Sequence, residues 1–192
     1  MKVRSVSFDT SFLLNKNIFI DQVIKILSHD NIPCFITTTV LSELKQLMVW
    51  GRISKNEYNT AIKRTKKTRA KIIDFKNRLL SDTFAKECVL SMKEHHGVDS
   101  KNIVNDCNIL VQTLKNGVDI FLSQDFHFTS KITRDVIDEV SSQACTDFQM
   151  MCDTNLYSID AKTFLDAYKM GEISIDVINS RIRSIKKDGK RL

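Results

Sequence analysis

Acidic side chains follow two short hydrophobic segments that read as buried strands. Asp9 comes directly after residues 3–8, in FDTSFLL, and Asp125 follows residues 120–123, in IFLSQDFHF. In a parallel sheet, ligands bind beyond the carboxyl ends of the strands. We therefore expect both carboxylates at the same edge of one sheet.

Two more acids are expected to reach that edge from helices. Glu43 lies in TTTVLSELKQL, in the first turns of the helix predicted after the second strand. Asp106 lies in the helix that leads toward the strand before Asp125, and Asn102 shares its face one turn earlier. The sequence thus predicts a cluster of four carboxylates.

Four carboxylates in one place repel each other strongly unless cations neutralise them. Hard divalent ions prefer oxygen ligands, so Mg²⁺ or Mn²⁺ is the expected occupant. Such a site activates water and stabilises the charge that develops during phosphodiester hydrolysis. The four acids are therefore both the expected metal ligands and the expected catalytic residues.

Hydrophobic periodicity predicts strands that alternate with helices. The predicted strands are residues 3–8, 34–38, 120–123 and 156–159, and the predicted helices cover about 17–30, 40–50, 54–80, 82–96, 100–116, 161–170 and 175–187. This order implies an α/β fold with a parallel sheet of four or five strands and right-handed crossovers. The stretch between the second and third of these strands is too long for one crossover. The helices over 52–97 are therefore expected to project as an arm from a single domain, residues 1–192.

Positive charge is concentrated in two segments. Residues 52–78 carry +8 and residues 181–192 carry +5, whereas the whole chain carries +6, so the remainder carries −7. An acidic body with two basic appendages indicates a polyanionic partner. We expect RNA phosphates to bind the basic face of the arm, and the basic tail at about 175–192 is the second candidate surface. The residues of that basic face are Lys63, Arg64, Lys67, Lys71 and Arg78.

The cysteines and the hydropathy pattern indicate a protein of the reducing cytoplasm. The five cysteines are scattered without C-x-x-C spacing, which argues against a disulfide framework or a structural zinc site. We expect them to be reduced and mostly buried. No stretch is long enough to cross a bilayer, and the N-terminus has no apolar signal core.

The ordered motifs resemble those of PIN-domain ribonucleases. DTSFLL, TTTVLSEL, NDCNIL and FLSQDFHF follow one another over residues 3–128, in the order typical of that family. The resemblance implies a parallel-sheet nuclease fold that cleaves RNA with Mg²⁺ or Mn²⁺ held by the four acids. It also implies that the hydroxyls of Ser11 and Ser123 support the site. Many members read D-x-D-F where this chain has Asp125-Phe126-His127-Phe128, so His127 replaces a frequent carboxylate and leaves open whether one or two metal ions bind.

Several alternatives remain open at this point. Within the nucleases, the chain is similar both to VapC-like toxins and, in its length and predicted arm, to the small protein-only ribonuclease P enzymes that process pre-tRNA. From a different class, a non-catalytic PIN scaffold that binds RNA or protein is the alternative function. An antitoxin or other protein partner and a homo-oligomer are also left open. A haloacid-dehalogenase-like phosphatase is rejected, because it needs a second acid at the position of Ser11.

Overall fold

A five-stranded parallel sheet forms the centre of the molecule. The structure, a computed structural model, describes residues 4–97, 99–152 and 155–169. The order of the strands across the sheet is β3-β2-β1-β4-β5, and every neighbouring pair is parallel. Their bounds are Val6–Phe8 for β1, Cys34–Thr37 for β2, Lys71–Ile73 for β3, Ile120–Leu122 for β4 and Tyr157–Ile159 for β5. The prediction of an α/β fold with a parallel sheet of four or five strands is confirmed.

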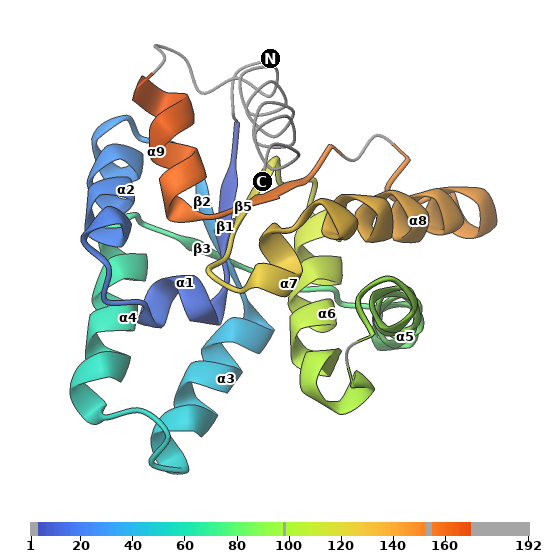
Figure 1. Cartoon of the computed structure of the whole chain (residues 1–192), viewed down its shortest axis with the longest axis horizontal. Helices are drawn as coiled ribbons and strands as arrows, with labels where there is room; N and C mark the ends of the chain where they lie inside the picture. Colours follow the sequence, from blue (N-terminus) through green and yellow to red (C-terminus); the bar gives the residue numbers. More distant parts are fainter. Residues whose placement is uncertain (1–3, 98, 153–154, 170–192) are drawn as a thin grey trace, which may run out of the picture.

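Nine helices are present among the described residues, and they flank this sheet (Figure 1). α1, α2, α4 and α9 lie on the left of the sheet in Figure 1, and α5, α6 and α8 on the right. The helices are α1 (Thr10–Leu14), α2 (Ile18–His29), α3 (Thr38–Val49), α4 (Lys55–Lys67), α5 (Arg78–His96), α6 (Ser100–Lys115), α7 (Phe126–Thr129), α8 (Lys131–Phe148) and α9 (Ala161–Lys169).

The two central strands have helices on both faces, which explains their composition. Every residue of β1 (Val-Ser-Phe) and of β4 (Ile-Phe-Leu) is buried, as expected for strands of a parallel sheet covered on both sides. The one polar residue among them, Ser7, is satisfied by a hydrogen bond of 3.2 Å between its hydroxyl and that of Thr113 on α6. Val6 pairs with Cys34 on one side and Ile120 on the other, which fixes the register of the sheet centre.

The strand order reverses between β1 and β4. From β1 the chain moves outward through β2 to β3, and it then returns across the sheet to β4 and β5. The connections on either side of such a switch point diverge, so the carboxyl ends of β1 and β4 open onto a natural ligand-binding crevice. Asp9 and Ser123 are the first residues after these two strands.

The secondary structure predicted for the first part of the arm is wrong. Instead of one helix over 54–80, α4 begins at Lys55 after a capping box formed by Ser54 and Glu57, and it ends at Lys67 with Thr68 as its C-cap. Arg69 then has a positive φ of 52°, and β3 joins the edge of the sheet beside β2. The sequence has no glycine at this helix end. The hydroxyl of Thr68 instead donates to the carbonyl oxygens of Arg64 and Thr65 in the last turn of the helix.

The remainder of the 52–97 segment packs on the body of the protein. α4 contacts α1, α2 and α3, and α5 contacts α6 and α8. The strand β3 also divides the long crossover into two of ordinary length. The basic residues of this segment therefore lie on the surface of the domain itself.

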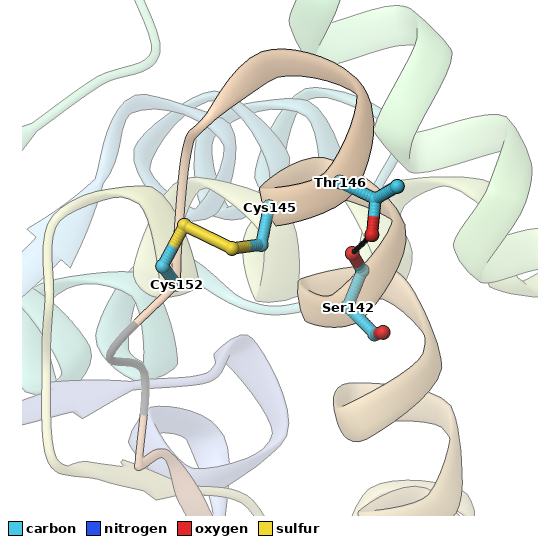
Figure 2. Close-up of a disulfide and its surroundings, with 4 residues drawn as sticks. All are labelled: Ser142, Cys145, Thr146 and Cys152. Atoms are coloured by element: carbon cyan, nitrogen blue, oxygen red, sulfur yellow. Dashed lines mark hydrogen bonds between the residues drawn. A yellow bond between two sulfur atoms is a disulfide. The ribbon is translucent and has the colours of Figure 1, made fainter.

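The sequence pattern did not predict α8, and the prediction for two of the five cysteines is wrong. Cys145 in the last turn of α8 forms a disulfide with Cys152 in the loop that follows, with 4.7 Å between the Cα atoms (Figure 2). Gln149 and Met151 between them have positive φ values and reverse the chain, which brings the two cysteines together. The other three, Cys34, Cys88 and Cys107, are free and buried as predicted.

None of the helices in the described part of the chain is long and apolar enough to span a membrane. The predicted helix at 175–187 and the basic tail at 175–192 lie outside the described residues.

Candidate active site

Asp9 is buried at the start of α1, directly beyond β1. It is the N-cap of this short helix and is only 3% exposed. Its Oδ1 accepts a hydrogen bond of 2.7 Å from the backbone N–H of Thr10, and its Oδ2 accepts from the hydroxyls of Ser11 and Ser123. Burial raises the pKa of the Asp9 carboxyl, and these hydrogen bonds partly oppose the rise. Asp9 is thus fixed in position by the two loops that meet at the switch point.

Ser11 and Ser123 connect those two loops. Their hydroxyl oxygens are 3.2 Å apart, and both groups bond to Asp9. The same hydroxyls also accept backbone hydrogen bonds of 3.0 Å, that of Ser11 from Gln124 and that of Ser123 from Asp125. Both serines therefore lie beside Asp9, where the resemblance to PIN domains implied supporting polar groups.

Glu43 reaches the same place from α3. Its Oε2 accepts a hydrogen bond from the hydroxyl of Thr10, the residue next to Asp9. Partial burial raises the pKa of Glu43 and the charge of Asp9 adds to this, whereas hydrogen bonds from Thr10 and Asn105 lower it. Thr10 and Asn105 were not among the predicted site residues. Nothing in their types distinguished them before the contact between α1, α3 and α6 was known.

Asp106 on α6 is influenced by all three of the other acids. Its pKa is raised to about 8, first by burial and then by the charges of Asp9, Glu43 and Asp125. The structure therefore places Asp106 within electrostatic reach of the three other acids that the sequence singled out, and the four come from separate elements. Figure 1 shows these elements, α1, α3, α6 and α7, around the lower end of β1.

Asp125 caps a helix and also acts electrostatically on another acid of the cluster. It is the N-cap of α7, and its Oδ1 accepts a hydrogen bond of 2.8 Å from the backbone N–H of His127. Its charge contributes to the raised pKa of Asp106 on α6. A cap needs only one carboxylate oxygen, so the second oxygen of Asp125 remains for other contacts.

Two histidine rings lie beside Asp125. The rings of His96 and His127 meet edge to face with 5.5 Å between their centroids. The pKa of His96 is lowered by partial burial and by His127 and His95, while Asp125 acts to raise it. The Nδ1 atom of His127 is buried without a hydrogen-bond partner among the described residues. His96 was not among the predicted site residues, and the contact of its ring with His127 links the end of α5 to α7.

The other predicted site residues have different outcomes. Asn102 lies on α6, but its side chain is outside the described part of the structure. Lys63, Lys67, Lys71 and Arg78 are exposed, so their predicted role in RNA binding remains a prediction.

Arg64 is not on the predicted basic face. It is only 8% exposed, and its guanidinium donates hydrogen bonds of 2.6 and 2.7 Å to the carbonyl oxygens of Leu13 and Asn15. It also forms an ion pair of 3.0 Å with Asp21. α4 turns this side chain toward α1 and α2, so its donors are used within the fold and the prediction that Arg64 binds RNA is wrong.

A pocket of about 410 Å³ lies away from the acids. It is formed by the chain around Leu14 and Asn15 and by the first turns of α4, and an ion pair of 2.9 Å between Lys16 and Glu57 lies at its lining. None of the four clustered carboxylates lines it. We take the carboxylate cluster as the candidate site, because burial and neighbouring acids raise the pKa of its carboxyls, whereas the pocket's Glu57 is already paired with Lys16.

The acids suit a divalent cation in chemistry, although no complete metal cage is present. Among the described residues, no three His, Cys, Asp or Glu side chains are arranged to hold a metal ion. Mg²⁺ does not require such a cage, since it keeps several waters and usually takes one or two carboxylates together with substrate phosphates. The hard oxygen donors and the accumulated negative charge therefore fit this ion.

Known proteins provide no closer identification of this site. No protein-family model matches the chain, and no curated protein sequence matches it.

Proposed function

We infer that this chain is a divalent-metal-dependent endoribonuclease, with Asp9, Glu43, Asp106 and Asp125 as its metal-binding and catalytic acids. The observation that carries the proposal is the pKa of Asp106, raised to about 8 by burial and by three acids from other elements. Like charges that are held close together in a partly buried place are unfavourable unless a cation neutralises them. A buried carboxylate whose pKa is perturbed by named charge partners is a mark of functional sites.

The charge of the cluster favours cation binding. A bound Mg²⁺ or Mn²⁺ ion would neutralise the acids, activate a water and stabilise the charge on the phosphodiester that is cleaved. Asp9 is held by hydrogen bonds from two serine hydroxyls and a backbone N–H. Thr10 holds Glu43 in the same way. These hydroxyls position the oxygen donors before any ligand arrives, which favours binding.

Exposed basic side chains of the same domain support a nucleic-acid substrate. Lys63, Lys67 and Lys71 are exposed on α4 and β3, in the segment with the largest excess of positive charge. Such side chains bind phosphates without regard to sequence. RNA binding by these lysines, together with hydrolysis at the acidic cluster, would account for the opposite charges of the two regions.

A non-catalytic scaffold is the second candidate, and one observation favours it. The described part of the protein has no ready arrangement of three metal ligands. In this reading, the serine and threonine hydroxyls around Asp9 and Glu43 serve only to stabilise buried carboxylates. The two candidates differ in whether the cluster binds a cation and cleaves RNA.

The deciding experiment is to incubate the protein with total RNA and either Mg²⁺ or Mn²⁺, with EDTA as the control. The ends of the products are mapped, and cation binding is measured separately by calorimetry. Cleavage that depends on the cation supports the nuclease, and the mapped ends distinguish a toxin-like cut from pre-tRNA processing. Intact RNA together with an absence of cation binding would favour the scaffold.

A further inference from the structure

Phe126 is an exposed aromatic side chain directly next to an acid of the candidate site. It follows Asp125 at the start of α7 and is 73% exposed. Two positions later, Phe128 is buried, and its ring meets that of Phe121 on β4 edge to face at 6.1 Å. Residues two apart on a helix point to nearly opposite sides. Phe128 therefore anchors α7 in the core and directs Phe126 outward.

Phe126 is part of a row of three rings, which we call the aromatic rim: Phe126, His127 and His96. The centroids of the Phe126 and His127 rings are 6.2 Å apart, and those of His127 and His96 are 5.5 Å apart. Asp125 directly precedes Phe126 and His127 in the chain, and its charge acts on the pKa of both His96 and Asp106. The aromatic rim thus directly borders the carboxylate cluster.

We propose that Phe126 positions the substrate of this site by stacking on an unpaired base of the RNA. The inference rests on the proposed nuclease function and adds a base-binding residue to it. Every base has a flat face that stacks on an aromatic ring, but a base within a duplex has both faces covered by its neighbours. Because Phe126 directly follows Asp125, a base stacked on its ring would hold the adjoining phosphodiester near the acids.

The surroundings of Phe126 fit a base better than a protein partner. Interfaces with proteins are marked by contiguous apolar patches of several hundred Å². Among the described side chains, the ring of Phe126 meets the polar ring of His127, which in turn meets that of His96, and Asp125 directly precedes Phe126. Imidazole rings also stack on bases. The aromatic rim itself therefore consists of one apolar and two polar rings, all of which can stack on a base.

The test measures the binding of a fluorescent oligo(A) 12-mer and of a 12-base-pair RNA duplex to the full chain in EDTA. In the absence of metal, binding is separated from cleavage. The variants are Phe126→Ala, Phe126→Trp and, as the matched control, Phe19→Ala on α2, which removes another exposed phenylalanine. Phe126→Ala should weaken binding of the single strand by roughly 5- to 150-fold, the range for loss of one stacked base. Phe126→Trp should restore it, and Phe19→Ala should have no effect.

Each outcome has a definite meaning. Selective loss of single-strand binding in Phe126→Ala, with rescue by tryptophan, supports the inference even if the wild-type protein cleaves no RNA. Equal affinity of the wild-type and Phe126→Ala proteins for oligo(A) overturns it, even if cleavage is observed. A wild-type protein that does not bind oligo(A) also overturns it. So does a Phe126→Ala variant that binds oligo(A) normally but loses self-association in size-exclusion chromatography, since Phe126 would then serve a protein contact.

Discussion

At the scale of single residues, the four acids are stabilised in different ways. Asp9 is the most buried, and three hydrogen bonds favour its charged form. Asp106 has no comparable compensation, and its pKa is raised to about 8 from an ordinary value of 3.8. Without a cation, a proton on Asp106 therefore relieves the repulsion in the cluster near neutral pH.

This raised pKa determines how the stability of the metal-free protein depends on pH. Between pH 3.8 and about 8, Asp106 is protonated in the folded state but not in the unfolded state. The folded state then binds more protons, so stability falls as pH rises through this window, by at most about 1.4 kcal/mol per pH unit. Below this window both states are protonated, and the penalty vanishes.

The first prediction is that Asp106→Asn stabilises the metal-free protein. Asparagine remains neutral, so the melting temperature in EDTA should rise by several degrees at pH 8 and by little at pH 5. The control is Asp82→Asn, an exposed acid on α5, which should change neither value. Melting curves at pH 5, 6, 7 and 8 provide the measurement. Parallel curves for the wild type and Asp106→Asn would contradict the raised pKa.

At the scale of elements, the site depends on helices that are held by few but specific contacts. α1 is only five residues long and carries Thr10 and Ser11 of the candidate site. Its carboxyl end is fixed by Arg64 of α4, which donates to the carbonyl oxygens of Leu13 and Asn15 and pairs with Asp21 on α2. Arg64 therefore supports the site from behind.

The second prediction concerns this contact. Arg64→Gln removes a buried cation and leaves two carbonyl oxygens without their donor, so it should destabilise the fold by about 2–4 kcal/mol. The neighbouring Lys63→Gln is the matched control, because Lys63 is exposed, and it should cost no more than about 0.5 kcal/mol. Urea denaturation measures both values. Equal stability of the two variants would show that Arg64 does not hold α1.

Strand β3 could not be predicted from the sequence, because its signal is not local. Strands β1, β2, β4 and β5 were predicted because their hydrophobic runs are fully or mostly buried. β3 has two exposed residues, Lys71 and Ile72, and continues the helical hydrophobic pattern of the segment before it. Only its pairing with β2 makes it a strand. The burial of Arg64 escaped prediction for the same reason, since charge alone does not reveal which side a helix turns inward.

The candidate site was more predictable than the arm. Asp9 and Asp125 follow central strands, and the rule for parallel sheets places their positions at one edge. The contributions of Thr10, Asn105 and His96 depend on contacts between α1, α3, α5, α6 and α7 that no spacing encodes. The sequence thus indicated the acids, while the groups that position and border them required the structure.

At the scale of the whole molecule, charge is distributed between an acidic cluster and a basic surface. Lys63, Lys67 and Lys71 remain exposed after the fold has turned Arg64 inward. They belong to α4 and β3, which are parts of the body of the domain and keep a fixed relation to the sheet. A polyanion bound to them is expected to lie in a defined direction relative to the acids.

The third prediction is that replacing these three lysines with glutamine weakens RNA binding and flattens its salt dependence. Each lost phosphate contact should lower the slope of log affinity against log salt concentration by roughly 0.7 for a single strand. A triple variant of Lys25, Lys86 and Lys162, all exposed, changes the net charge equally and serves as the control. Fluorescence anisotropy between 50 and 300 mM salt, about the range over which phosphate contacts are released, measures both. Identical slopes for the two triple variants would exclude a specific phosphate-binding surface.

The most direct test of the central proposal is single-turnover cleavage of RNA in Mn²⁺ by the wild type, Asp106→Asn and Asp82→Asn. Asp106→Asn is the informative variant, because it is expected to fold at least as stably as the wild type. If the four acids form one metal-dependent site, its cleavage rate should fall by at least about 100-fold, while Asp82→Asn remains fully active. Cleavage at the wild-type rate by a folded Asp106→Asn protein would contradict the account.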